Sequence, residues 1–448
     1  MSGRLPARAV VATAVFAVIA ASRWPFLTPG YGVEIDAWRV ANTARSISHN
    51  GVYEISRFPG YPAHEIVCSW FWRGGPIALN GTSALMALLA CAAVWSIARK
   101  LNTPNELLLI AALAATPAFY VSSVTTKDYV WALAFSWLAL RLAMDGRAWP
   151  SGILLGLATG CRLTAAAMFL PVAIVLWSGK GRSRSSAIVG CAAATAVTAL
   201  ICFLPVLRHY GSSFLLAYAH ARPDAAAIIE RATLGVWGGI GSLALAVGWG
   251  ATLIRPRLKP AAASISAFDA ALLVIIAVYS TAYLMLPDQS GYLLPLVPAV
   301  LLLLARFAPE RVFQSVCIAL VLVPFIDLNT RGLQAGAILA DHRQRERSIA
   351  DVQRFVQFAE SALPGENLIV VGGWQPLISA LTPHVHNHYI YLATAAELHR
   401  ALERGWRIAY TSRVIRDFNY AARGVNLDAF AAIDLQRLLA EQQTPRPK

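Results

Sequence analysis

The stretch 150–177 reads PSGILLGLATGCRLTAAAMFLPVAIVLW, and it decides how the rest of the chain is arranged. It is apolar on both sides of a break at Gly160, Cys161 and Arg162. A helix that crosses a bilayer needs about 20 residues. The stretch is therefore either one long membrane span or two short helices that enter the membrane and return, with Arg162 at the far side.

The positions of Lys and Arg elsewhere in the chain distinguish between these two interpretations. Other apolar runs occupy residues 9–22, 77–97, 107–121, 129–144, 187–207, 234–254, 268–286, 292–305 and 312–326. Lys and Arg cluster at 99–100, 180–184, 255–259 and 306–311. With a cytoplasmic N-terminus and a broken pair at 150–177, every cluster falls on the cytoplasmic side, as topology rules favour; one long span would put the later clusters outside. We therefore predict about eleven membrane helices.

The composition agrees with a membrane protein. Of 448 residues, 57% are hydrophobic and 14% are charged, against about 25% charged in an average soluble domain. This excludes a disordered chain and argues against a cytosolic enzyme. The net charge of +14 comes from Lys and Arg in short loops, so we expect contact with anionic lipid and no nucleic-acid partner. The six cysteines form no CxxC pair, which favours buried residues over disulfides or a zinc site.

The predicted fold class is a polytopic α-helical membrane protein with a small C-terminal α/β extracytoplasmic domain. Residues 1–326 would form the membrane bundle, with a first outside loop at 23–76, and 327–448 would form the second domain. In that domain we expect helices at 348–362, 394–405 and 427–441 and strands at 367–371 and 406–411. Thr394 and Glu397 have the spacing of a capping box. Strands that alternate with helices are typical of an α/β layer.

Three histidines in the same domain, His384, His386 and His388, would share one face of a strand. They could bind zinc, but no fourth ligand is evident, which favours an exposed polar edge. No G-x-G-x-x-G or P-loop lysine motif occurs, so nucleotide binding has no support in the sequence.

The first segment outside the membrane carries the most informative residues. It contains YGVEIDAWR at 31–39 and RFPGYPAHE at 57–65. Glu34 and Asp36 come soon after a membrane helix, and the apolar residues of 36–47 would let a helix lie flat on the bilayer. Another acid, Asp128, begins a later span from the same side. A carboxylate can take a proton from a sugar hydroxyl, so these acids predict an active site.

Cationic side chains would be needed beside them, because a leaving phosphate requires cations or a metal to stabilise its charge. The outward-facing candidates are Arg57, Lys127, Arg162, Arg208, His209, Arg222 and Arg231. Arg162 is costly between apolar helices, so it is either a phosphate contact or half of a structural ion pair. No cofactor motif is present; a divalent cation, Mg²⁺ or Mn²⁺, at Asp36 and Asp128 is the cofactor that these acids suggest.

Structural explanations compete with these functional roles at three of the positions. Asp36 could be a helix N-cap or a solvated surface acid. Asp128 at a helix start would favour the helix dipole without any function. Lys127 would extend to the membrane interface.

The order of these pieces resembles the GT-C superfamily of integral-membrane glycosyltransferases, which includes protein mannosyltransferases, lipid A aminoarabinose transferases and bacterial lipopolysaccharide glycosyltransferases. The similar pieces are the acidic first loop with Asp36, the block Tyr61, Pro62 and His64, the acid Asp128, GLATGCR at 156–162 and YLLPLVP at 292–298. Two positions depart from the family pattern. Glu65 follows the histidine where many members have proline, and Gly291 precedes Tyr292 where an arginine is usual.

The resemblance implies inverting transfer of a sugar from a polyprenyl-phosphate-linked donor to a lipid-linked glycan, a lipid A-type acceptor or a protein. We predict Asp36 as catalytic base, with Asp128 and Glu34 assisting it or binding a metal. We predict that donor phosphate or substrate is bound by His64, Arg57, Tyr61, Lys127, Arg162, Arg208, Arg222 and Tyr292. We expect a bacterial inner-membrane protein with a cytoplasmic N-terminus and a periplasmic C-terminal domain.

Two other classes fit part of the pattern. A transporter or flippase of lipid-linked saccharides would also use broken helices and outside charges, but it should show paired repeats and substrate residues at the midplane. We find no repeat, and the acids lie at the outer surface. A lipid-linked glycan ligase or polymerase would rely on Arg and His in a large outside loop, which 208–231 offers only faintly.

Overall fold

The computed structural model describes residues 4–179, 184–211, 223–254, 266–329, 332–411 and 430–433. They form two compact units. The first unit comprises residues 1–31 and 43–342, and the second comprises 32–42 and 343–448. The contacts thus divide the chain within two helices, α2 (Ile35–Asn50) and α16 (Ala337–Ala362), whereas the composition suggested a boundary at 326/327.

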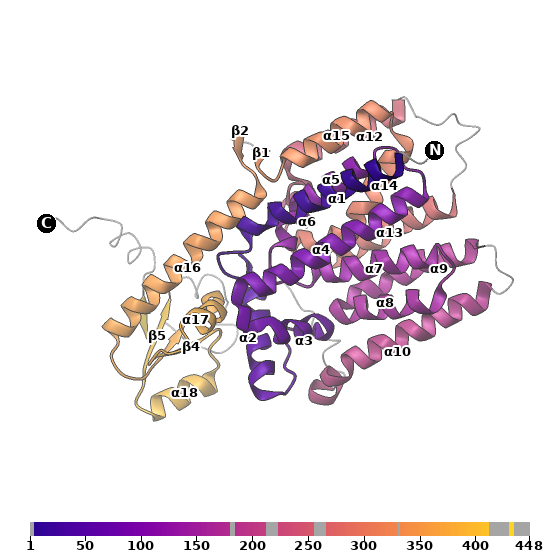
Figure 1. The fold of residues 1–448 in the computed structure, drawn as a ribbon. Helices are drawn as coiled ribbons and strands as arrows, with labels where there is room; N and C mark the ends of the chain where they lie inside the picture. The colour runs from indigo at the N-terminus through magenta and orange to yellow at the C-terminus, as the bar shows by residue number, and fades with distance from the viewer. Residues whose placement is uncertain are drawn as a thin grey trace. The chain divides into compact units, whose positions relative to one another are not determined.

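The first unit is a helical bundle (Figure 1). Its remaining helices are α1 (Arg4–Arg23), α3 (Pro62–Phe71), α4 (Gly75–Lys100), α5 (Glu106–Ala115), α6 (Pro117–Ser123), α7 (Tyr129–Ala143), α8 (Ala148–Cys161), α9 (Phe169–Ser178), α10 (Arg184–Tyr210), α11 (Ala225–Ala232), α12 (Leu234–Ile254), α13 (Ala267–Met285), α14 (Val297–Phe307) and α15 (Glu310–Leu322). Short 3₁₀ turns include η3 (Leu163–Met168) and η6 (Ser290–Leu296). A hairpin of β1 (Ile326–Asn329) and β2 (Gly332–Ala335) follows α15.

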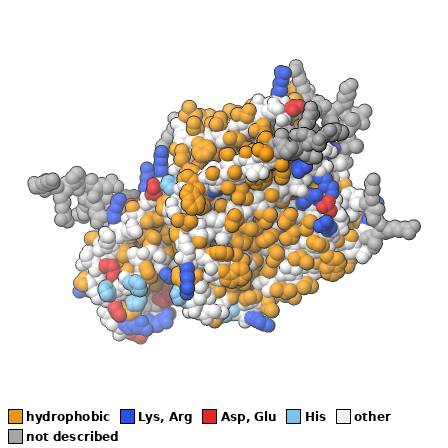
Figure 2. Space-filling view, in the orientation of Figure 1, with side chains coloured by type: hydrophobic (Ala, Val, Ile, Leu, Met, Phe, Trp, Pro, Cys, Tyr) orange, Lys and Arg blue, Asp and Glu red, His pale blue; other side chains and the backbone are white. Residues whose placement is uncertain are grey.

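Six helical segments among the described residues are long and apolar enough to cross a membrane, and the bent pair α5 and α6 would make a seventh. Three shorter apolar helices cover 129–143, 148–161 and 163–178. A helix coincides with each predicted apolar run, which confirms the predicted polytopic fold. Hydrophobic side chains cover much of the face of the bundle seen in Figure 2, as a lipid-facing surface requires.

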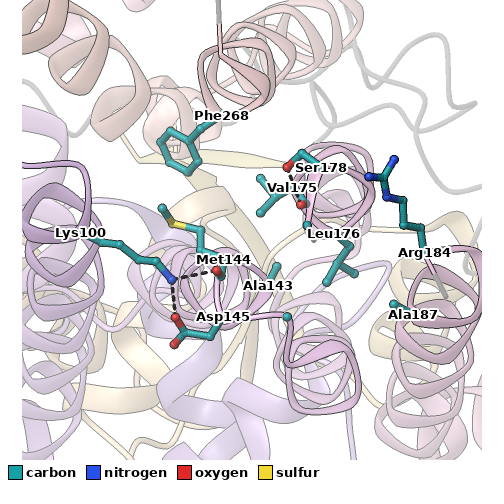
Figure 3. A pocket seen from close by; sticks show the side chains of 12 residues that line it. Lys100, Ala143, Met144, Asp145, Val175, Leu176, Ser178, Arg184, Ala187 and Phe268 are labelled. Carbon is teal, nitrogen blue, oxygen red and sulfur yellow. Dashed lines mark hydrogen bonds and ion pairs between the residues drawn. The ribbon is translucent and has the colours of Figure 1, made fainter. Parts of the chain in front are cut away.

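The broken pair at 150–177 is present. Helix α8 ends at Cys161, and Arg162 has an extended backbone (φ −160°, ψ 116°) before η3 and α9 begin. Asp145, just before α8, and Ser178, at the end of α9, line the same cavity of about 730 Å³ (Figure 3). Both ends of the pair therefore lie at one end of the bundle, and the single long span is excluded.

Ion pairs gather at that same end of the bundle. Asp145 pairs with Lys100 and with Arg141, whose Nη1 lies 2.6 Å from the carboxylate. Arg306 pairs with Asp269 at 3.0 Å, next to Phe268 of the same cavity. The clustering of cations at one end agrees with the topology argument, while the cytoplasmic location of that end stays a prediction.

The second unit contains a parallel sheet with strand order β4-β3-β5-β6. Its elements are β3 (Asn367–Val370), α17 (Gln375–Leu381), β4 (His388–Ile390), α18 (Ala395–Glu403), β5 (Arg407–Thr411) and β6 (Ala431–Ile433). Buried residues of β3, β5 and α18, including Val370, Ile408 and Leu398, form its core. This confirms the predicted α/β character, and the capping box of Thr394 and Glu397 is present.

Two predictions in this unit need correction. A helix was expected over 427–441, but the described residues there form strand β6, because Ala431–Ile433 pair in parallel with β5; the rest of that range lies outside the described residues. The three histidines do not share a strand face, since only His388 lies in β4, where its ring stacks on Trp406 at 4.2 Å. No group of three metal-ligating side chains occurs within the described ranges.

Candidate active site

Asp128 is the centre of a buried ion-pair cluster in the first unit. Its carboxylate is fully buried at the start of α7 and makes no helix-capping hydrogen bond. Arg57 Nη2 lies 2.9 Å from Oδ1, and Arg162 Nη1 lies 2.6 Å from Oδ2. Burial alone would raise the pKa of Asp128, but the two guanidinium groups outweigh it and hold the pKa well below its usual range. Asp128 is therefore an ionised ion-pair partner of two arginines, and its side chain makes no capping hydrogen bond to α7.

Tyrosine rings enclose the two arginines. The Arg162 guanidinium lies 4.4 Å from the ring centroids of both Tyr129 and Tyr292, and the Arg57 guanidinium lies 4.0 Å from that of Tyr61. Such cation–π contacts stabilise a cation most strongly when water is excluded. The cluster thus joins residues from four separated parts of the chain.

Lys127 extends the positive region. Its Nζ lies 4.8 Å from the Tyr129 ring centroid and 3.3 Å from Gln289 Oε1, which also accepts a hydrogen bond from the Tyr129 hydroxyl. The departure at Gly291 now has a physical reason. A Cβ there would lie 2.8 Å from the Tyr129 ring, so the family's usual arginine would displace the ring.

Asn80 fixes the loop that carries Asp128. It is fully buried, and its side-chain amide donates to the carbonyl oxygens of Leu27 (2.7 Å) and Gly30 (2.9 Å). Its Oδ1 accepts a hydrogen bond from the Thr126 hydroxyl at 2.7 Å. The position of Asp128 is therefore tied to helix α4 through side-chain bonds.

Glu65 fixes the loop that carries Arg57. It is fully buried and accepts hydrogen bonds from the Tyr53 hydroxyl and from the backbone N–H groups of Ser56 (2.9 Å) and Tyr61 (3.1 Å). Burial, followed by the nearby Glu65 charge, raises the pKa of Tyr53, so its hydroxyl stays a donor. The sequence flagged Glu65 as a departure from the family pattern, and its role in the structure is to order this loop.

His64 lies one turn away from this loop and is fully buried. Its Nε2 lies 3.4 Å from Cys68 Sγ, and its ring packs edge-on against Trp131. No described hydrogen bond joins it to Arg57 or Asp128. Its role as a phosphate contact stays a prediction.

The two acids of the first loop belong to the second unit, so their place relative to Asp128 is not described. Asp36 is the second residue of α2, its side chain is 18% exposed, and Arg39 Nη1 lies 3.5 Å from Oδ1. Glu34 is exposed just before the helix. Their catalytic roles stay predictions.

The remaining predicted cations do not join the cluster through any described contact. Arg208 and His209 are exposed at the end of α10, and His209 packs against Tyr210. Arg231 donates to the Pro287 carbonyl oxygen at 2.7 Å. Arg222 lies outside the described residues.

Asp128 and its described neighbours do not by themselves form a site for a divalent cation. Both carboxylate oxygens already face guanidinium groups, and no cluster of three ligating side chains was found in the part of the chain described here. A metal shared by Asp36 and Asp128 stays a prediction.

Comparison with known proteins is informative at two levels. Residues 76–209, which include Asp128 and Arg162, match the family model of dolichyl-phosphate-mannose-protein mannosyltransferases. The crystal structure of apo ArnT from Cupriavidus metallidurans is similar with a TM-score of 0.55 and 14% identity, over 90% of this chain and 89% of that one. No curated protein matches. The chain thus has the fold of ArnT, and both matches agree with the resemblance to GT-C glycosyltransferases seen in its sequence.

Proposed function

We propose that this protein is a membrane glycosyltransferase that takes a sugar from a polyprenyl-phosphate-linked donor. The acceptor would be a hydroxyl of a lipid-linked glycan, a lipid A-type molecule or a protein. We place the reaction at the outer face of a bacterial inner membrane, with the C-terminal domain on that side. The family model that matches 76–209 is named for a polyprenyl-phosphate sugar donor, which supports this choice.

One observation carries the proposal: a single fully buried carboxylate is shared by two guanidinium groups. Two cationic side chains thus face one carboxylate, and a third cation, Lys127, lies beside Tyr129. Glu65 holds the loop that carries Arg57 through its hydrogen bonds with Tyr53 and with backbone N–H groups. Ionisable groups gathered at such depth in a membrane protein commonly mark a substrate site. Arginine suits phosphate because its planar group can make two parallel hydrogen bonds.

The chemistry follows from this charge. As the bond between the anomeric carbon and the donor phosphate oxygen breaks, its electron pair leaves with the phosphate. Arg57 and Arg162 would stabilise that growing negative charge. The acceptor hydroxyl attacks the opposite face of the anomeric carbon, which inverts it, and Asp36 would take the hydroxyl proton. No step of this mechanism uses a metal.

Asp128 has a different role from the second acid that the sequence suggested. Its two ion pairs and its lowered pKa make it a poor proton acceptor. We assign it to holding the Arg57 and Arg162 side chains in the orientation that binds phosphate. In this role Asp128 acts through the two arginines that it orients.

Two arginines that flank α8 provide a matched test. Arg162 follows the helix within the cluster, whereas Arg147 precedes it and is exposed at the opposite end. In membranes supplied with a radiolabelled polyprenyl-phosphate-sugar pool, Arg162→Gln should lower transfer by about 100-fold, and Arg147→Gln should stay within about twofold of wild type. Equal transfer by wild type and folded Arg162→Gln would refute the assignment of the phosphate site.

A further inference from the structure

The second unit has the strand arrangement that commonly creates a ligand crevice. From β3 the chain goes to β4 on one side, and it then returns to β5 on the other side of β3. In open parallel sheets, ligands bind outside the carboxyl ends of the strands at the point where the order reverses. Here that point is the turn after β3, where Gly372 adopts a positive φ of 57°.

The chain's own segment 32–42 packs against this edge of the sheet. Gly373 continues the turn after β3, and a Cβ there would lie 2.6 Å from Ile35 Cδ1. The glycine therefore lets the turn contact the Ile35 side chain closely. Segment 32–42 and the sheet belong to the same compact unit.

Two polar contacts extend this packing along one face of α2. Asn42 Nδ2 donates to the Pro376 carbonyl oxygen at 2.8 Å, at the beginning of α17. The Arg39 guanidinium lies 4.7 Å from the ring centroid of Tyr391, which directly follows β4. Ile35, Arg39 and Asn42 are spaced by four and three residues, so a single helix face makes all three contacts.

Asp36 lies within this docked segment. Arg39, held over Tyr391, is also the residue whose Nη1 lies 3.5 Å from Asp36 Oδ1. On the other side, buried Trp38 donates its Nε1–H to the Gly32 carbonyl oxygen at 2.8 Å and closes the turn before the helix. The backbone around Asp36 is thus fixed from both sides, while the carboxylate keeps some exposure.

We propose that the C-terminal α/β unit uses the carboxyl edge of its sheet to position Asp36, with Arg39, Asn42 and Tyr391 as positioning residues. This inference rests on the proposed role of Asp36 as base. It assigns the domain to catalysis rather than to binding a separate ligand. A base must lie within hydrogen-bond reach of its proton, and a displacement of about 1 Å can cost about 100-fold in rate.

The test measures the transfer rates of full-length variants as a function of donor concentration. Tyr391→Leu and Asn42→Ala should each lower kcat by about tenfold while the donor KM stays within about twofold. Tyr391→Phe, which keeps the ring, should restore kcat. Asn50→Ala is the matched control, because Asn50 lies on the same helix, is exposed and bonds only to Ser46 among the described contacts.

Hydrogen exchange provides a readout that does not depend on activity. Tyr391→Leu should raise deuterium uptake in the peptide 32–42, whereas Asn50→Ala should leave it unchanged. Normal kcat and normal uptake in Tyr391→Leu and Asn42→Ala, with Asp36→Asn inactive, would overturn the positioning role alone. Full activity in Asp36→Asn would refute the role of Asp36 itself, and with it this inference.

Discussion

Replacing Asp128 with asparagine should strongly destabilise the bundle. The substitution removes the carboxylate that pairs with both Arg57 and Arg162, and these side chains are only 13% and 12% exposed. Removing one partner of a buried ion pair typically costs about 3–5 kcal/mol, because a charge is left buried without its partner. The two pairs share one carboxylate, so we expect a single cost in that range rather than twice that amount.

Asp145 provides the matched control for this measurement. It also pairs with two cations, Lys100 and Arg141, but its side chain is 30% exposed. Exposed pairs contribute about 0–1 kcal/mol, so Asp145→Asn should be nearly neutral. Unfolding of the purified protein in a detergent titration can be followed by fluorescence of its 13 tryptophans. A cost for Asp128→Asn no larger than that for Asp145→Asn would refute the buried-cluster account.

Three further predictions follow from described geometry. The pKa of Asp128 is lowered in the folded protein, so its ion pairs should stabilise the fold fully above about pH 4 and lose this contribution as the pH falls further. The difference in free energy of unfolding between wild type and Asp128→Asn should therefore be constant between about pH 5 and 8, and it should shrink in acid. Gly291→Ala should push the Tyr129 ring from its place and raise the donor KM by about threefold to tenfold, measured by initial rates; an unchanged KM would contradict the role of the tyrosine rings. Helix α12 is kinked at Gly238, which has a φ of 72°. Gly238→Ala should destabilise the bundle by about 1–3 kcal/mol in the same detergent titration, because a Cβ there would also lie 2.7 Å from Asp327 Oδ2. A neutral effect would show that this kink tolerates a side chain.

The parts of the fold that depend on local pattern could be predicted from the sequence. Apolar runs of spanning length gave the helices, and the Lys and Arg clusters identified the break at Arg162. The capping box at Thr394 follows from two residues three positions apart. The helix expected over 427–441 was wrong where β6 forms, because pairing with β5 decided the conformation of a short apolar segment.

The candidate site was predictable only in part. Residue chemistry singled out Arg57, Asp128 and Arg162, but not that one carboxylate would bridge two arginines that lie 71 and 34 positions away. The hydrogen-bonding role of Glu65 and the docking of segment 32–42 on the sheet depend on tertiary contacts between distant segments. No periodicity or spacing rule reports such contacts.

The most direct test of the central claim is a reconstituted transfer reaction with purified protein in liposomes. Wild type, given a radiolabelled polyprenyl-phosphate sugar and membrane acceptors, should release one polyprenyl phosphate for each sugar transferred. Folded Asp36→Asn and Arg162→Gln should both lose this activity, whereas Arg147→Gln should keep it. Absence of transfer by wild type across a range of such donors, or equal transfer by all four proteins, would contradict the account.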